Sequence, residues 1–284
     1  MNTNSNAYTV IYTTLVVVVV AAVLAFTAMK LKPSQSANAK AETLRQMMSA
    51  AGIKSTDELY ATKNADVLQL YADNIEQAYT IGLNGEQNGT LAVDKANIEL
   101  VDNLKPQNKG IKDNAEVTLP VYVFKSGVAV IPIYGAGLWG PIWGYVAFQP
   151  DHYTIAGAYF DHESETPGLG AKIKDEAWFR EQFVGKTVNF ANADQLFRIV
   201  KGGAPKDDKS AVDAITGATM TCNGLDAALN TWFKAYMPFL QKKAGAAGID
   251  EAGCCGEGCC GEGCDGDHEH CNGEHNHQHN HQEG

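Results

Sequence analysis

The apolar residues of this chain follow three patterns: an uninterrupted run, a helical spacing and a strand spacing. Each pattern predicts a different element. From Val10 to Met29 there is no charged residue. A helix of this length spans about 30 Å, the thickness of the hydrocarbon core of a bilayer. Although the stretch is rich in valine, a backbone in lipid must satisfy its hydrogen bonds internally, so a helix is favoured over a strand. Residues 1–9 contain no Lys or Arg, unlike a typical signal peptide, so we predict an uncleaved membrane anchor.

A helical spacing of apolar residues follows the anchor. Residues 36–51 are strong helix formers, and Gly52 supplies a stop. A second, weaker helical pattern covers residues 57–79. Two Asn-Gly pairs within residues 83–93 predict a turn-rich insertion or a hairpin.

From Val117 the pattern changes to the short period of strands. Four segments are spaced by about 10 to 14 residues with turn residues between them, which is typical of an antiparallel meander. They cover residues 117–124, 128–134, 142–148 and 154–160. Further along we expect a short helix on the sheet, a strand and a long helix, at residues 175–182, 197–201 and 221–241. The predicted class is α+β, with an antiparallel sheet and packed helices. The predicted regions are 1–32 (N-terminal residues and anchor), 33–114 (helices and insertion), 115–245 (main domain) and 246–284 (tail).

The net charge of −11 belongs mostly to the tail, because nine acidic residues and no Lys or Arg lie after residue 249. The rest of the chain is nearly neutral, so no basic face for nucleic acid is expected. The tail is glycine-rich with little apolar content, which predicts disorder. Its thiolates and imidazoles suit Zn, Cu or Ni, although their spacing fits no zinc-finger pattern. The alternatives are a dispensable extension and disulfides. The candidate metal ligands are Cys254, Cys255, Cys259, Cys260, Cys264, His268, His270, Cys271, His275, His277, His279 and His281.

Residues 213–221, DAITGATMT, form the strongest candidate site. Gly217 and Ala218 let the backbone approach a bound group closely, while Thr216, Thr219 and Thr221 offer hydroxyls. The helix that follows offers free N–H groups and a positive dipole end, where phosphate binds readily. An ordinary helix N-cap is the plainer interpretation. No Ser-His-Asp triad, carboxylate pair or nicotinamide fingerprint can be identified, so no catalytic residue is predicted.

The same residues carry a resemblance. Asp213 to Thr219 matches the D-x-x-[ST]-G-A-T flavinylation motif of FMN-binding domains. Leu31-Lys32-Pro33, the segment 135–140 (GAGLWG) and the segment 162–170 (HESETPGLG) are similar to the C subunit of the Na+-translocating NADH:quinone reductases. The G subunit of a related ferredoxin:NAD electron-transport complex shares the motif and is the alternative. A third hypothesis is a membrane-anchored metal-binding protein that acts through its tail.

The resemblance implies that an FMN transferase attaches FMN to Thr219 through a phosphoester. It also implies a slot for the flavin ring, with Leu138 and Trp139 on one side. The other side would be formed by Glu165, Thr166, Leu169 and Gly170. The plainer interpretations are a core or membrane-interface role for Trp139 and a type II turn at Pro167-Gly168.

The implied function is that of an electron relay within a larger complex. The chain would pack against the other membrane proteins of that complex, which passes electrons from NADH to a quinone and exports Na+. The resemblance places the flavin domain on the periplasmic side of a bacterial inner membrane. Lys30, Lys32, Lys40 and Arg45 favour the opposite orientation by the positive-inside rule. We expect the periplasmic side, because partner helices in a complex can override a few charges.

Overall fold

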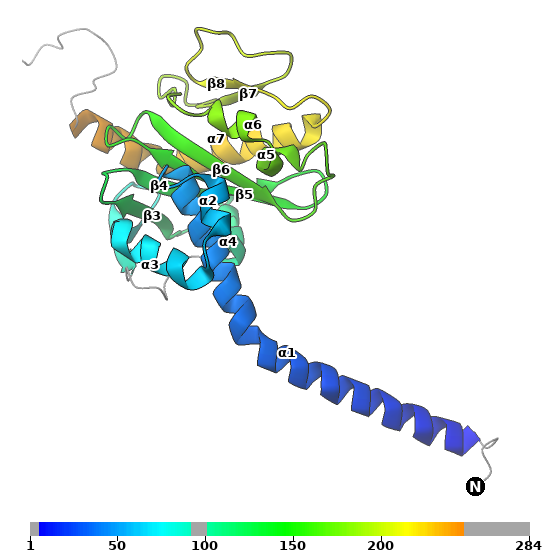
Figure 1. The fold of residues 1–284 in the computed structure, drawn as a ribbon. Coiled ribbons are helices and arrows are strands. Elements are labelled where there is room, and N and C mark those ends of the chain that lie inside the picture. The colour runs from blue at the N-terminus through cyan, green and yellow to red at the C-terminus, as the bar shows by residue number, and fades with distance from the viewer. Residues whose placement is uncertain (1–5, 92–100, 247–284) are drawn as a thin grey trace, which may run out of the picture. The chain divides into compact units, whose positions relative to one another are not determined.

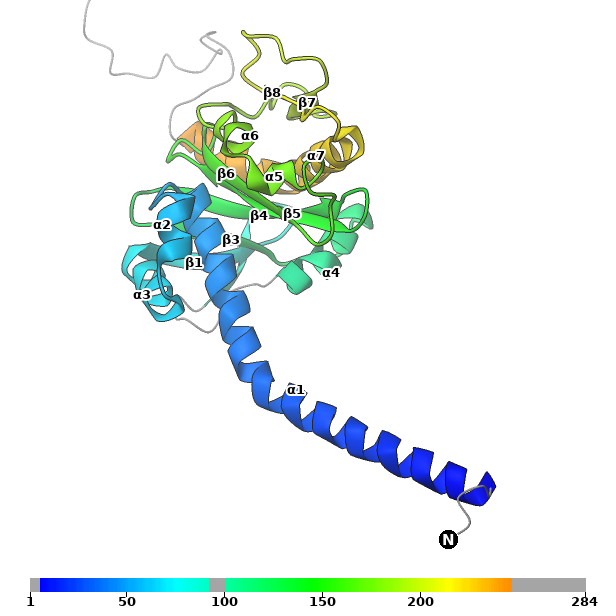
Figure 2. The same ribbon diagram turned by 45° about the vertical axis from the view of Figure 1, so that its right-hand side comes forward.

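A six-stranded antiparallel sheet with helices on both faces organises the chain (Figures 1 and 2). This computed structural model describes residues 6–91 and 101–246. Contacts divide the chain into Met1–Ile249 and Asp250–Gly284. The predicted metal ligands of the tail lie outside the described residues. The predicted α+β class, with an N-terminal apolar helix and an antiparallel sheet, is confirmed.

The sheet contains the four predicted strands and two more. Its order is β2-β1-β3-β4-β5-β6, and every neighbouring pair is antiparallel. The strands are β1 (Ile75–Ile81), β2 (Gln87–Leu91), β3 (Leu119–Phe124), β4 (Ala129–Ala136), β5 (Pro141–Phe148) and β6 (Ile155–His162). The hairpin expected within residues 83–93 therefore exists as part of β1–β2.

The helix predicted over residues 57–79 is wrong in its last part. The segment forms α2 (Thr56–Ala61) and α3 (Asn64–Asn74), and then turns into β1. Pairing with β3 decides this, because Ala78 lies opposite Tyr122 and both side chains are buried. A local helical pattern gives way here to a contact between distant segments.

Helix α1 (Asn6–Ala50) joins the predicted anchor and the helix that follows it. Its apolar stretch is long enough to cross a membrane and is exposed throughout, whereas the C-terminal end is buried against β5 and β6. Pro33 lies inside the helix, lacks an N–H donor and gives a physical reason for the bend visible in Figure 1. Two residues after the helix ends, Gly52 has φ +69° and Ile53 N donates to Met48 O, as in a Schellman motif.

The other face of the sheet is covered by α7 (Thr219–Ala246). Its side chains Leu225, Leu229, Trp232, Phe233 and Tyr236 are fully buried, as the apolar stripe predicts. The remaining elements are α4 (Val101–Lys112), α5 (Lys172–Asp175), α6 (Ala177–Glu181), β7 (Arg198–Val200) and β8 (Ala211–Asp213). The sequence predicts neither α4 nor β8, which pairs in parallel with β7.

Two apolar clusters lie on opposite faces of the sheet. In β3 and β4, Val121 and Ile131 contact the α7 cluster, while Tyr122 and Val130 contact the α1 cluster. Because both faces are covered, these strands are apolar at nearly every position rather than at alternate ones.

Candidate functional site

The candidate site begins at the loop between β8 and α7. Ala218 N donates to Ile215 O at 3.1 Å, and Gly217 lies between them with φ +85°. That left-handed conformation is the one a type II turn requires at its third position, which explains a glycine there. Helix α7 then begins at Thr219, so the predicted loop-to-helix transition occurs in this segment.

The first turn of α7 has unpaired backbone donors. Within the described part of the chain, the backbone N–H groups of Thr219, Met220 and Thr221 donate no hydrogen bond. The Thr219 side chain is half-buried, while Thr216 and Gly217 are exposed. A helix start with open N–H groups and the positive end of the helix dipole is a place where an anionic group binds favourably.

Glu165 connects this turn to the segment 135–140. Its Oε2 accepts from Thr221 Oγ1 at 2.6 Å, and its Oε1 accepts from Trp139 N at 2.9 Å. The side chain is only 4% exposed. The sequence predicts Glu165 at the ring slot, and in the structure its carboxylate accepts from these two protein donors.

Three glycines make these contacts possible. A Cβ on Gly137 would overlap Glu165 Oε1, and one on Gly170 would overlap Glu165 Oε2 and Thr221 Oγ1. A Cβ on Gly224 would overlap Ala136 O, so α7 crosses the end of β4 at very close range. Three of the four segments that carry the resemblance therefore meet in space.

Four large apolar side chains are exposed in the segments that meet at this turn. Leu138 is 49% exposed, Trp139 66%, Leu169 45% and Met220 59%. Leu169 lies against Gly217, because a Cβ on that glycine would be 3.0 Å from Leu169 Cδ2. Clustered exposed side chains of this kind mark a binding surface more often than isolated ones do. Met220 was missed by sequence reasoning, although its position next to Thr219 could have indicated it.

The segment 166–170 forms the turn that the plainer interpretation predicts. Leu169 N and Ala171 N both donate to Thr166 O at 3.1 Å. Gly168 has φ +76° and follows Pro167, which is the sequence of a type II turn. Thr166 is exposed and Gly170 is buried, so the turn brings Leu169 to the surface beside the loop.

Cys222 is the one thiol within the described residues, and it is 2% exposed. Its Sγ accepts from Ile215 N at 3.4 Å, and burial raises the pKa of the thiol. It is therefore a structural residue of the first turn. No group of three or more potential metal ligands occurs among the described residues.

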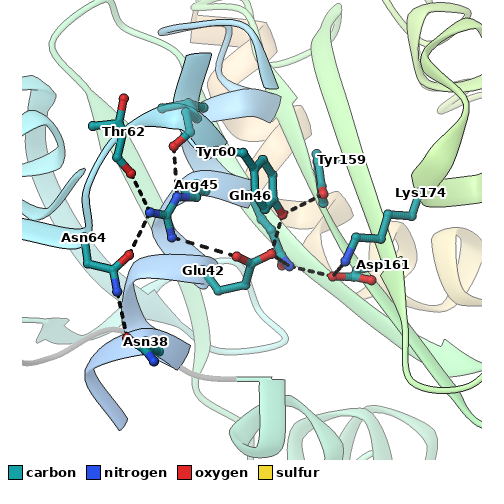
Figure 3. A network of polar contacts seen from close by, with 11 residues as sticks. Asn38, Glu42, Arg45, Gln46, Tyr60, Thr62, Asn64, Tyr159, Asp161 and Lys174 are labelled. Carbon is teal, nitrogen blue, oxygen red and sulfur yellow. Dashed lines mark hydrogen bonds and ion pairs between the residues drawn. The ribbon is translucent and has the colours of Figure 1, made fainter. Parts of the chain in front are cut away.

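A second polar network, which the sequence does not predict, joins α1 to the sheet (Figure 3). Asp161 is 4% exposed, and its Oδ2 accepts from Gln46 Nε2 and Lys174 Nζ, both at 2.8 Å. Glu42 accepts from Tyr60, whose hydroxyl lies 3.0 Å from that of Tyr159.

In the same network, Arg45 is 8% exposed and ties α1 to the segments that follow it. Its guanidinium donates to Leu59 O at 2.9 Å and to Thr62 O at 2.8 Å. These contacts attach the C-terminal end of the apolar helix to the folded region.

Comparisons with known proteins identify a family model and relatives that are similar to this chain. The family model for the FMN-binding domain matches residues 137–234. Two proteins named as the C subunit of a Na(+)-translocating NADH-quinone reductase are similar to this chain. The one from Vibrio campbellii is 31% identical over 236 residues, covering 76% of this chain and 86% of the relative. The one from Yersinia pestis is 32% identical over 260 residues, covering 85% and 94%.

Solved structures of C subunits also superpose on this chain. The C subunit of the Na(+)-translocating NADH-quinone reductase from Parabacteroides distasonis superposes with a TM-score of 0.59 at 28% identity, covering 74% of this chain and 96% of that one. Shewanella oneidensis NqrC superposes with a TM-score of 0.59 at 27% identity, covering 74% and 99%.

Proposed function

This chain belongs to the family of the C subunits of Na(+)-translocating NADH-quinone reductases, and from this premise we propose that it relays electrons through FMN bound covalently to Thr219. The observation that carries the proposal is the placement of Thr219 at the open start of α7, beside exposed apolar side chains. The Vibrio and Yersinia relatives are named for the quinone reductase, which favours this function over that of a ferredoxin:NAD complex.

The residues present fit such a group. A phosphate esterified to Thr219 would lie at the unpaired amides of Thr219, Met220 and Thr221, where the helix dipole stabilises its negative charge. Leu138, Trp139, Leu169 and Met220 offer apolar surface for a flat ring. Thr216, Gly217 and Ala218 form the turn in front of the helix, and Gly170 packs closely against Glu165 and Thr221.

When bound, FMN supplies electron transfer, while the protein supplies position and electrostatics. Covalent attachment would prevent its loss, and the residues of the loop and first turn would hold its phosphate end in place. The protein would pass electrons within a complex that oxidises NADH, reduces a quinone and exports Na+. The exposed apolar part of α1 would pack against the other membrane proteins of the complex and anchor the chain as a single-pass protein.

We place the flavin domain on the periplasmic side of the inner membrane. The family argues for this side, whereas Lys30 and Lys32 argue against it. Protease treatment of intact spheroplasts tests the choice. Digestion of residues 34–284 is expected, and protection of these residues would contradict it.

We also propose that the Cys/His-rich tail binds Zn, Cu or Ni. Its soft sulfur ligands and imidazoles carry this proposal. Calorimetric titration of the full chain with Zn²⁺, and of a chain ending at residue 246, is expected to show heat of binding only with the tail. Equal binding by both chains would contradict the proposal.

Mass spectrometry of the peptide that contains Thr219 tests the main proposal. The protein should come from cells that also make the FMN transferase. A mass increase on Thr219, and a fluorescent band on a denaturing gel, are expected in the wild type and absent in Thr219→Val. The control is Thr231→Val on the same helix, where the hydroxyl bonds Ala227 O. An unmodified Thr219 in this material would contradict the proposal.

A further inference from the structure

Glu165 links three segments that the proposed flavin site uses. Resting on that proposed function, we propose that Glu165 is a positioning residue: its buried carboxylate holds the Trp139 backbone and the first turn of α7 in one fixed arrangement around Thr219. We call its hydrogen bonds from Trp139 N and Thr221 Oγ1 the Glu165 bridge. Glu165 would act through these neighbours rather than by contacting the flavin.

Burial and geometry support a role within the protein. Glu165 is 4% exposed, and each of its oxygens accepts one hydrogen bond. Gly137 and Gly170 pack so closely on the carboxylate that a Cβ on either would overlap an oxygen. A group enclosed in this way presents no free acceptor to a ligand on the surface.

The contacts also hold Trp139 from both sides of its backbone. Glu165 accepts from Trp139 N, and Ser164 Oγ donates to Trp139 O at 3.1 Å. Glu165 N in turn donates to His162 Nδ1 at 3.1 Å, which orients the segment itself. Trp139 is therefore exposed as a side chain but held firmly as backbone, which is the arrangement expected of a rigid surface contact.

The other end of the bridge reaches the first turn of α7. Thr221 is 2% exposed and lies two residues after Thr219 on the same turn. A group attached at Thr219 and a ring resting on Trp139 would be placed relative to one another by Glu165. Without the bridge, the segment 137–140 would lose its hydrogen-bonded link to the first turn of α7.

Hydrogen exchange in the full-length apoprotein, made without the transferase, is the first test. In Glu165→Ala the amide of Trp139 is expected to exchange about tenfold faster, since an ordinary hydrogen bond is lost. Glu165→Gln should restore most of the protection, because its amide oxygen can still accept from Trp139 N. The matched control is Glu163→Ala, an exposed glutamate two residues away, which should match the wild type.

The second test uses the same full-length variants carrying FMN. Because a tryptophan in contact with a flavin quenches its fluorescence, emission per bound FMN should rise in Glu165→Ala. Adding Trp139→Leu to Glu165→Ala should then cause little further rise, whereas the same change in the wild type should cause a large one. This dependence on Trp139 is a readout that a general loss of stability would not produce.

The two proposals fail in different ways. If Thr219 carries FMN and Glu165→Ala matches Glu163→Ala in both exchange and emission, the positioning role is contradicted. Failure of Glu165→Gln to restore exchange protection would contradict the hydrogen-bond basis of the role. If Thr219 is unmodified, the proposed function fails, while the exchange test still judges the bridge. Should Glu165→Ala not fold, Thr221→Val removes one arm of the bridge, and unchanged emission in that variant would overturn the proposal.

Discussion

Two buried carboxylates lie four residues apart at the end of β6, and they differ in the charge of their hydrogen-bond donors. Asp161, at the contact between α1 and the sheet, accepts from the ammonium of Lys174 and the amide of Gln46. Glu165, at the candidate site, accepts only neutral donors, and no Lys or Arg pairs with it among the described residues. Both residues are 4% exposed.

The difference indicates two kinds of task. At Asp161 the negative charge is balanced by a cation, so this network serves to hold α1, β6 and α5 together. At Glu165 both donors are neutral, so among the described residues this contact joins the Trp139 backbone to the first turn of α7 without an ion pair.

The largest effect is expected from breaking the charged pair. Asp161→Ala removes the acceptor for Gln46 and leaves Lys174 without its partner. Because Lys174 is partly exposed and can be rehydrated, we expect a loss of about 3 kcal/mol in the free energy of unfolding, the lower end for buried pairs. Urea unfolding of the full chain in detergent, followed by circular dichroism, measures it. The exposed Asp175→Ala should change it little.

The next largest effect is expected from adding a Cβ atom to a closely packed glycine in each of the two regions. A Cβ on Gly157 would overlap the backbone oxygen of Ala50, which cannot move away, so Gly157→Ala should cost about 2 kcal/mol. A Cβ on Gly170 would overlap the end of the Glu165 side chain, which can shift. Gly170→Ala should therefore cost less in unfolding but should speed hydrogen exchange at Trp139. Equal exchange in the two variants would contradict this contrast.

Removing one hydroxyl from each network gives a smaller effect. Thr221→Val leaves Glu165 Oε2 buried without its donor, and we expect a loss of about 1.5 kcal/mol. Tyr60→Phe removes a donor to Glu42, whose side chain is 34% exposed, so water can replace it and about 0.5 kcal/mol is expected. Unfolding of both variants under one condition makes the comparison, and the reverse order would be inconsistent with it.

The smallest effect is a dependence on alkaline pH. Partial burial acts to lower the pKa of Lys174, but the hydrogen bond and charge of Asp161 outweigh it, so the pKa is raised. A lysine with a raised pKa in the folded state stabilises the protein below its unfolded pKa of about 10.4, and this contribution is lost as pH rises through the folded pKa. The difference in the free energy of unfolding between wild type and Lys174→Met should therefore shrink as the pH rises through the folded pKa of Lys174.

Nearby groups define the control for this measurement. Burial raises the pKa of Tyr60 and Tyr159 in the same network, so both also destabilise the fold at alkaline pH. Because both tyrosines are present in wild type and Lys174→Met, the effect of their burial cancels, and the difference between the two proteins reports on Lys174 together with its charge interaction with Tyr159. A difference that stays constant from pH 8 to strongly alkaline pH would contradict the assignment.

Sequence patterns succeed where an element is defined by its own residues. The anchor is visible as an uncharged run before Lys30. The four central strands and the apolar stripe of α7 are visible as periodicity. The pattern fails at α4, which contains Pro106 and Gly110 and is a poor helix former by itself. There Leu104 is buried in the core and Gln107 bonds Thr118, so tertiary contacts support the helix.

The sequence by itself determined the chemistry of the candidate site: a threonine at a helix start after a flexible glycine, and apolar residues in two other motifs. Only the tertiary structure decided which of these residues meet. Glu165 is 56 residues from Thr221 and 26 from Trp139 along the chain, and the register of β4, β5 and β6 brings them together. Periodicity reports which face of an element is buried, whereas contacts between distant segments depend on strand register and close packing, which no local pattern records.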